Sequence, residues 1–574
     1  MRESATPEQP ATGLLVATTA ESSTTLSSLE NGAIAIVDTD VEMGTPKSVQ
    51  NEVKVPLTRS QFILVFIGLM LGIMMAALDQ TIVSTALKAV VGDLGHQDLV
   101  PWIGSAYLLT AAPFGALYGK FADLFGRKWV FVFALVVFEV GSLICAAAPT
   151  METLILGRAI AGVGGGGIFS CVLIIISDIV SIQDRGKFQG MIGACFGLSS
   201  VIGPLIGGAF SDNVSWRWCF YINLPLGVIT VATVIVFLNF PIPEGTLSSK
   251  ISRIDGLGIV SLFATIICII TPLQLGGSIW DWNSAQTIVM FVLSPFLFAA
   301  FVYIEVKVAK EPIIPASMFM NASIPALLVV AFAMGAGFFS AVYYISLFFQ
   351  MVNGDSATAA GVKTIPLVFG VVALSITSGV YISKTGNYKR FLFIGPVFMI
   401  SGASLTAFLD VNSLLVQKVF YLLIFGIGCG AMIQTRVLAI QASVPVHLIA
   451  IVTAVSQTCM TLGGAFGVSI SGTIFNNIIS TEINNYPTLT SAISQLQQHG
   501  IPAHPTEVLA LSGMLKSVPF LTNGSAANDD LVAVFNHAYK IAYLTLLVYP
   551  IVILGMTPFI KQFSMRSPPT SVSK

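Results

Sequence analysis

Three charged side chains interrupt otherwise apolar stretches of this sequence. Asp79 lies in the run 62–87, Glu139 about halfway along 129–148, and Arg158 near the start of 154–176. A charged group within an apolar run of membrane-spanning length is costly unless it faces a partner or a cavity. Burial disfavours the charged form of a carboxyl group and so raises its pKa. A proton carrier that works near neutral pH needs such a raised pKa. The three residues are therefore candidates for proton coupling.

Each candidate has an alternative interpretation. Asp79 could meet a cationic substrate, or be solvated or capping at the outer end of its helix, and Glu139 could hydrogen-bond to a neighbouring helix. Arg158 could extend to the outer boundary of the membrane, because its run begins only about four residues earlier. The sequence allows Arg158 to pair with either Glu139 or Asp79.

The composition is that of a membrane protein. Of 574 residues, 55% are hydrophobic and only 10% are charged, with a mean hydropathy of +0.86. A soluble domain carries about 25% charged residues. The net charge of −1 gives no reason to expect a nucleic-acid partner, and the seven cysteines show no paired spacing, so neither a disulfide framework nor a metal site is expected.

No nucleotide-binding motif supports an ATP-driven pump or another cofactor-dependent function. The sequence contains no G-x-x-x-x-G-K-[ST], which excludes a P-loop. Gly162, Gly164 and Gly167 match G-x-G-x-x-G, but no strand precedes them; small residues there favour close helix packing instead. We expect no cofactor and no enzyme activity.

Apolar runs near 20 residues match the helix length that crosses about 30 Å of hydrocarbon. Fourteen are predicted: 62–87, 100–118, 129–148, 154–176, 188–210, 220–240, 255–275, 286–305, 323–350, 360–382, 391–409, 416–440, 449–475 and 535–560. Basic residues gather in alternate loops, which assigns those loops and both termini to the cytoplasm. The plasma membrane is the expected location, because the sequence shows no recognisable targeting signal for the vacuole or another membrane.

The spans predict five regions. These are a disordered cytoplasmic tail (1–58), a six-helix bundle (59–240), a linker with two extra membrane helices (241–310), a second six-helix bundle (311–561) and a short cytoplasmic tail (562–574). The second bundle includes a long polar outer loop, 476–534, in which Asn523 begins an Asn-Gly-Ser glycosylation acceptor pattern.

The charged loop 119–128, GKFADLFGRK, carries the first family resemblance. Gly119, Asp123, Gly126, Arg127 and Lys128 resemble the G-x-x-x-D-x-x-G-R-K loop between the second and third helices of the major facilitator superfamily. By that resemblance, Asp178 and Arg185, in the next loop on the same side, complete a charge cluster that latches the outward-facing state.

Two further segments resemble the fourteen-helix drug:proton antiporters of this superfamily. LDQTIVSTAL (78–87) is similar to the L-D-x-T-I-V-x-x-A-L signature, with Lys88 where that family has proline, and Arg158 resembles the fourth-helix arginine associated with proton coupling. The segment 216–227 looks like the fungal toxin-efflux branch. These likenesses imply that Asp79 and Arg158 are residues to test for coupling; Glu139 joins them because of its depth in the third span.

The fifth span resembles the motif associated with exporters rather than importers. Its matching residues are Gly190, Gly203, Pro204, Gly207 and Gly208, with Ser199 in place of one glycine. Proline removes an intrahelical hydrogen bond, and flanking glycines let a neighbouring helix approach. A generic kinked helix is the alternative.

The C-terminal spans contain few charges. Tyr343, Gln350, Gln434 and Gln457 are weak candidates for a substrate cavity, and Arg436 is expected to extend to the cytoplasmic face.

The sequence thus predicts an all-α polytopic membrane protein with the major facilitator fold: two six-helix bundles plus a two-helix central insertion. The predicted function is proton-coupled efflux of a hydrophobic secondary metabolite, mycotoxin or drug, for which a monomer suffices. Proton-coupled uptake, for example of a siderophore, is the alternative. A receptor would not need the export motif or acids within its spans.

Overall fold

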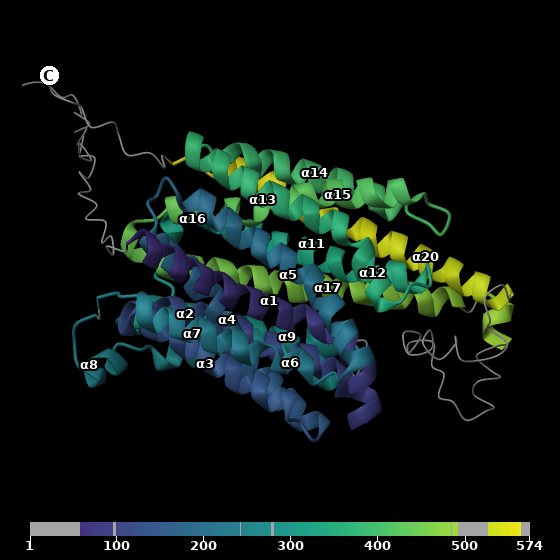
Figure 1. Ribbon diagram of the computed structural model, residues 1–574, viewed down its shortest axis with the longest axis horizontal. Helices are drawn as coiled ribbons and strands as arrows, with labels where there is room; N and C mark the ends of the chain where they lie inside the picture. Colours follow the sequence, from purple (N-terminus) through teal and green to yellow (C-terminus); the bar gives the residue numbers. More distant parts are fainter. Residues whose placement is uncertain are drawn as a thin grey trace, which may run out of the picture. The chain divides into compact units, whose positions relative to one another are not determined.

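The computed structural model describes residues 58–95, 99–241, 243–276, 280–483, 485–491 and 526–563. Most of these residues are helical, and the long helices run roughly parallel to one another (Figure 1). Nearly all of the predicted tails 1–58 and 562–574, together with Asn523, lie outside the described residues.

The first half of the described chain forms ten helices before a short π-helical turn. They are α1 (Arg59–Leu94), α2 (Val100–Phe125), α3 (Arg127–Ala146), α4 (Met151–Ile179), α5 (Arg185–Asn213), α6 (Trp218–Tyr221), α7 (Asn223–Phe237), α8 (Leu247–Ser252), α9 (Gly256–Leu275) and α10 (Ala285–Tyr303), followed by η2 (Ile304–Val308).

The second half continues with the following elements: η3 (Ala316–Met320), α11 (Ser323–Met351), α12 (Ala357–Lys363), α13 (Ile365–Thr385), α14 (Lys389–Ala407), α15 (Leu415–Ile433), α16 (Thr435–Ala442), η4 (Val446–Leu448), α17 (Ile449–Ile483), α20 (Ala526–Thr545), α21 (Val548–Met556) and η7 (Thr557–Phe559).

Thirteen helical segments of the described residues are long and apolar enough to cross a membrane, and they coincide with thirteen predicted spans. The remaining span, 100–118, lies within α2, whose 26 residues pack against α4, α9 and α17. The prediction of an all-α polytopic membrane protein is confirmed.

Four predicted spans are each divided between two helices. The pairs are α6 with α7, α12 with α13, α15 with α16, and α20 with α21. In three of them Pro225, Pro366 or Pro550 follows the break by a few residues; proline cannot donate to the preceding helical turn, so the ladder of hydrogen bonds is interrupted there. Helix also occupies both ends of the predicted loop 476–534, because α17 continues to Ile483 and α20 begins at Ala526.

Two large buried clusters form the cores. One belongs mainly to α1–α7, the N-terminal block, and includes Leu69, Phe131 and Phe138. The other belongs mainly to α11–α21, the C-terminal block, and includes Met334 and Phe425. Large apolar side chains also cover the exterior, which suits contact with lipid tails.

The central insertion, α9 and α10, forms a hairpin beside α2. Ile266 of α9 and Phe301 of α10 share a buried cluster with Ala112 and Ala116 of α2. The two blocks meet through other helices: α5 packs against both α1 and α13, and α17 packs against both α11 and α2. Residues on these helices therefore lie where the blocks meet.

Candidate functional site

A buried ion pair joins α1 and α4. The Nη1 atom of Arg158 lies 2.5 Å from Oδ2 of Asp79; Asp79 is fully buried and Arg158 is only 2% exposed. The sequence allowed Arg158 to pair with either Asp79 or Glu139, and in the structure its partner is Asp79. Burial also rules out an arginine that extends to the membrane boundary and an aspartate solvated at a helix end.

Arg158 is held by more than its partner. Its Nε donates to the carbonyl oxygen of Ile103 at 3.1 Å, and its guanidinium lies 4.6 Å from the ring centroid of Tyr107, a cation–π contact. The second carboxylate oxygen of Asp79, Oδ1, has no hydrogen-bond partner among the described residues. The pair therefore keeps an acceptor position for a proton or another donor.

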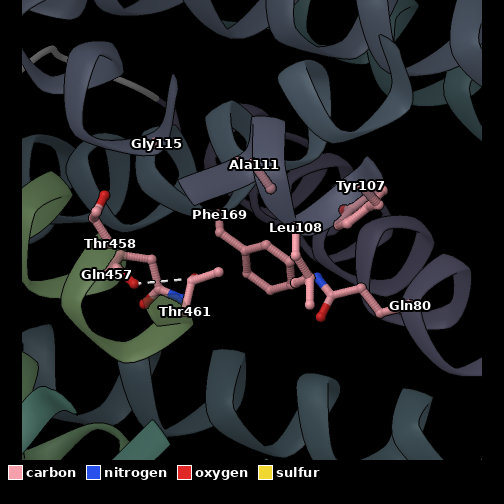
Figure 2. A pocket seen from close by; sticks show the side chains of 10 residues that line it. Gln80, Tyr107, Leu108, Ala111, Gly115, Phe169, Gln457, Thr458 and Thr461 are labelled. Atoms are coloured by element: carbon pink, nitrogen blue, oxygen red, sulfur yellow. Dashed lines mark hydrogen bonds between the residues drawn. The ribbon is translucent and has the colours of Figure 1, made fainter. Parts of the chain in front are cut away.

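A small pocket lies where the blocks meet (Figure 2). The N-terminal block contributes residues of α1, α2 and α4, and the C-terminal block contributes residues of α17. Its lining consists of Gln80, Tyr107, Leu108, Ala111, Gly115, Gly166, Phe169, Gln457, Thr458 and Thr461. Tyr107 links the two features, because its ring lines the pocket and covers Arg158.

The lining combines apolar walls with a few polar groups. Figure 2 shows Phe169 and Leu108 between Gln80 on one side and Gln457, Thr458 and Thr461 on the other. Such a surface suits a largely hydrophobic ligand with a small number of polar groups.

Glu139 lies apart from this pocket. A Cβ atom on Gly227 of α7 would lie 1.9 Å from its Oε1, so the carboxyl group rests against the backbone of that helix. Neither carboxyl oxygen has a hydrogen-bond partner among the described residues. One helical turn away, Asn223 donates to Ser142 at 3.2 Å. The expected alternative, a hydrogen bond from Glu139 to a neighbouring helix, is therefore not formed in the described structure.

The four candidate cavity residues are not together. Gln457 lines the pocket, whereas Tyr343 is 45% exposed, and Gln350 bonds within its own helix to Ser346. Gln434 is buried against Gly193 of α5.

The predicted charge cluster forms around Arg127. Its side chain lies 2.7 Å from Asp123 and 3.0 Å from Asp178, which ties the α2–α3 turn to the end of α4. Arg185 is buried and lies close enough to Asp178 to act on it electrostatically. Lys128 does not join the cluster; its Nζ donates instead to the carbonyl oxygen of Ile235 at 2.7 Å.

Two glycines of the same loop have separate geometric roles. Gly126 ends α2 at φ +92°, a conformation that favours glycine. A Cβ on Gly119 would lie 2.8 Å from the carbonyl oxygen of Ala450 in α17, so this glycine permits contact between the blocks.

Replacing Arg127 by glutamine is expected to lower the stability of the folded protein by roughly 1–3 kcal/mol, because two partly buried carboxylates lose their shared cation. Burial already raises the pKa of Asp123, and Arg127 opposes that rise. Without Arg127 the pKa rises further, so the variant loses stability more steeply than wild type as pH increases.

The measurement is the melting temperature of purified protein across a pH series. Lys128→Gln is the matched control, because it removes the adjacent positive charge outside the cluster. Equal pH slopes for wild type and Arg127→Gln would contradict the assigned role of Arg127.

The glycines of the predicted export motif are contact points for three different helices. A Cβ on Gly203 or Gly207 would come within 2.1 Å of Thr81 or 2.4 Å of Thr85 in α1. Gly208 instead faces Thr358 of α12, and Pro204 lies inside α5. Gly190 faces α13 of the other block, where a Cβ would lie 2.4 Å from the carbonyl oxygen of Ser375.

Further contacts join the blocks near the end predicted to be cytoplasmic. Gln189 donates to Gln441 at 2.9 Å, and the backbone N–H of Lys187 donates to Ser383 at 2.9 Å. Glu311, in the segment between η2 and η3, accepts from Arg253 at 2.6 Å and from Lys120 at 2.9 Å, which ties that segment to the connection between α8 and α9 and to α2. The hydrogen bond from Arg253, followed by that from Lys120, holds the pKa of Glu311 below its ordinary value.

Arg436 does not extend to the cytoplasmic face, contrary to the prediction from the sequence. It is only 2% exposed and donates hydrogen bonds to Ser456 and Gln457 of α17. The sequence signal was present, since Arg436 interrupts a long apolar span as Arg158 does. The pocket residues Tyr107 and Gln80 and the pair Gln189–Gln441 carried no comparable signal.

The described residues contain no group of three or more His, Cys, Asp or Glu side chains arranged to hold a metal ion. All seven cysteines are free.

Comparisons with known proteins agree with the architecture. The family model described as Major Facilitator Superfamily matches residues 69–468. The chain is 36% identical to an MFS-type efflux pump, MFS1, of Arthroderma benhamiae over 458 residues, covering 78% of this chain and 85% of the relative. It is also 36% identical to the efflux pump aflT of Aspergillus parasiticus over 426 residues, covering 74% of this chain and 83% of the relative.

Solved structures show the same fold at low sequence identity. The proton:xylose symporter XylE, bound to 6-bromo-6-deoxy-D-glucose, superimposes with a TM-score of 0.54 at 13% identity, covering 88% of this chain and 98% of that chain. The human organic anion transporter MFSD10 gives 0.54 at 14% identity, covering 84% and 99%. With the family model matching most of the sequence and the helical architecture in agreement, this chain belongs to the Major Facilitator Superfamily.

Proposed function

We propose that this protein exports a hydrophobic small molecule, such as a secondary metabolite, mycotoxin or drug, across the plasma membrane in exchange for protons. The observation that carries the proposal is the buried Asp79–Arg158 pair beside a largely apolar pocket between the two blocks. The names of the relatives support the direction of transport, and the resemblance of 190–208 to the export motif adds to that support.

Proton coupling through this pair has a direct physical basis. When Asp79 takes a proton, Arg158 loses its counter-charge and is left with only neutral partners, the carbonyl oxygen of Ile103 and the ring of Tyr107. A buried charge without a partner is unfavourable, so the guanidinium and its contacts must rearrange. Because Tyr107 lines the pocket, such a rearrangement changes the surface that the substrate meets.

Alternating access then requires the two blocks to rock around the pocket. The contacts of α5 with α13 and of α2 with α17 are the ones that must break and re-form. Glycines and single hydrogen bonds contribute to these contacts, as at Gly190 and at the hydrogen bond from the Lys187 backbone to Ser383. Interfaces of this kind can separate without removing a large apolar core from its surroundings.

The test is efflux of a fluorescent dye or toxin from proteoliposomes under an imposed pH gradient without ATP. Efflux that follows the size and sign of the gradient supports antiport. An efflux rate that does not change with the gradient contradicts proton coupling. Movement of substrate in the same direction as the protons supports proton-coupled uptake instead.

Glu139→Gln is expected to retain gradient-driven efflux within about threefold of wild type, a change worth less than 1 kcal/mol. The reason is that Glu139 rests on α7 and the Asp79–Arg158 pair remains intact in this variant. Initial efflux rates at several gradient sizes measure the effect. A loss of gradient dependence would instead make Glu139 the proton carrier.

A further inference from the structure

Arg436 is a buried cation without an anionic partner among the residues that the structure describes. Its Nη1 donates to Ser456 at 2.8 Å, and its Nη2 lies 3.3 Å from Gln457 Oε1 and 2.5 Å from the sulfur of Met460. All three partners are neutral. No carboxylate of the described residues lies within ion-pair distance of Arg436, and its Nε has no hydrogen-bond partner among them.

Such an arrangement is unfavourable without a compensating anion. Removing an arginine from water costs several kcal/mol in real proteins, and neutral hydrogen bonds repay only part of that cost. The buried charge of Arg158 is compensated by the carboxylate of Asp79. No described carboxylate compensates Arg436, so binding of an anion from outside the chain would be strongly favoured there.

The pocket is the route by which that counter-charge could arrive. Gln457 both lines the pocket and contacts Arg436, so the guanidinium lies directly behind one pocket wall. On the opposite side, Tyr107 separates the pocket from Arg158. Arg158 is thus paired with Asp79 on one side of the pocket, whereas the positive charge of Arg436 on the other side has only neutral partners among the described residues.

We propose that the pocket takes a lipophilic organic acid in its anionic form, with Arg436 as the counter-ion of the acid group. The apolar residues Leu108 and Phe169 contact the hydrophobic body of the ligand. Gln457 turns aside or shares its hydrogen bond so that the acid group reaches Arg436. This inference rests on the proposed export function and narrows its substrate class.

The experiment compares 1-pyrenebutyric acid with its methyl ester, which share a hydrophobic body and differ in charge. Dissociation constants are measured by fluorescence on purified full-length protein in nanodiscs, with protein-free nanodiscs subtracted. Wild type is expected to bind the acid about tenfold or more tightly than the ester, since a charge-assisted hydrogen bond to a buried arginine is lost in the ester.

Arg436→Gln is expected to weaken binding of the acid to the level of the ester, and Arg436→Lys to keep part of the preference. Arg390→Gln is the matched control, because Arg390 is an exposed arginine that bonds to Tyr381. Should Arg436→Gln fail to fold, the wild-type acid-to-ester ratio still decides. Equal or tighter binding of the ester to wild type, or an equal loss of both ligands in Arg436→Gln, overturns the proposal.

Efflux of the same two probes from proteoliposomes separates this inference from the export proposal. Acid that binds with the expected preference but is not exported supports the anion site and contradicts export of this class of molecule. Export of the ester with exclusion of the acid supports export and overturns the anion site.

Discussion

Replacing Asp79 by asparagine is expected to abolish the response of efflux to a pH gradient, with a loss of about 100-fold in gradient-driven rate, near the upper end of typical coupling free energies. Asparagine has nearly the shape of aspartate and can still accept a hydrogen bond from Arg158. It cannot exchange a proton or change its charge. Arg158 therefore remains in one electrostatic state, and binding of a proton can no longer bias the arrangement of α1, α4 and Tyr107.

The comparison needs a control that removes an acid from the same helix. Asp93 lies at the C-terminal end of α1, where Arg217 and Trp216 hydrogen-bond to it and hold its pKa below its ordinary value. Asp93→Asn should therefore keep gradient-driven efflux. Counterflow in the absence of a gradient tests whether Asp79→Asn still binds and moves substrate. Gradient-driven efflux by Asp79→Asn at the wild-type rate would show that coupling resides elsewhere.

Replacing Gly190 by valine is expected to shift the protein away from the conformation described here by roughly 1–3 kcal/mol, the usual cost of forcing atoms into a packed contact. A Cβ at this position would lie 2.4 Å from the carbonyl oxygen of Ser375, which is backbone and cannot turn aside. The contact joins α5 of one block to α13 of the other. The substitution therefore opposes closure of the blocks at this point rather than the folding of either block alone.

Gly104→Val is the matched control. It makes the same change within a helix, but a Cβ there would meet nothing within 4 Å. The measurement is cross-linking by a short bis-maleimide between cysteines placed at Lys187 and Ser383, whose contact lies beside Gly190. Gly190→Val should lower the cross-linking yield and the efflux rate, whereas Gly104→Val should change neither. Unchanged cross-linking in Gly190→Val would mean that α5 and α13 absorb the extra volume without separating.

The two variants examine different halves of one mechanism. Asp79→Asn removes the response to protons while leaving the contacts between the blocks intact. Gly190→Val leaves the ion pair intact and alters the balance between conformations. If the proposed antiport mechanism holds, combining them should give slow transport that also ignores the gradient.

The sequence by itself determined the class of fold. Backbone groups in hydrocarbon must be hydrogen-bonded within the segment, so a run of about 20 apolar residues is nearly always a membrane helix. That local rule located the spans, and the loop 119–128 and segment 190–208 carried the family resemblance. The same rule identified Asp79, Glu139 and Arg158, because a charged residue inside an apolar run can be recognised without knowing which side chains surround it in the fold.

Only the tertiary structure decided which of these residues meet. Membrane helices that are apolar on nearly every side carry little periodic signal for the face that turns inward. Whether Arg158 lies beside Asp79 or Glu139, and whether Arg436 reaches the membrane surface or Gln457, depends on how each helix is rotated and where it crosses its neighbours. The same holds for Arg127 and Lys128, adjacent bases of which one joins two carboxylates and the other a carbonyl oxygen. Residue type and position along a span are local properties, whereas partnership is a property of helix packing.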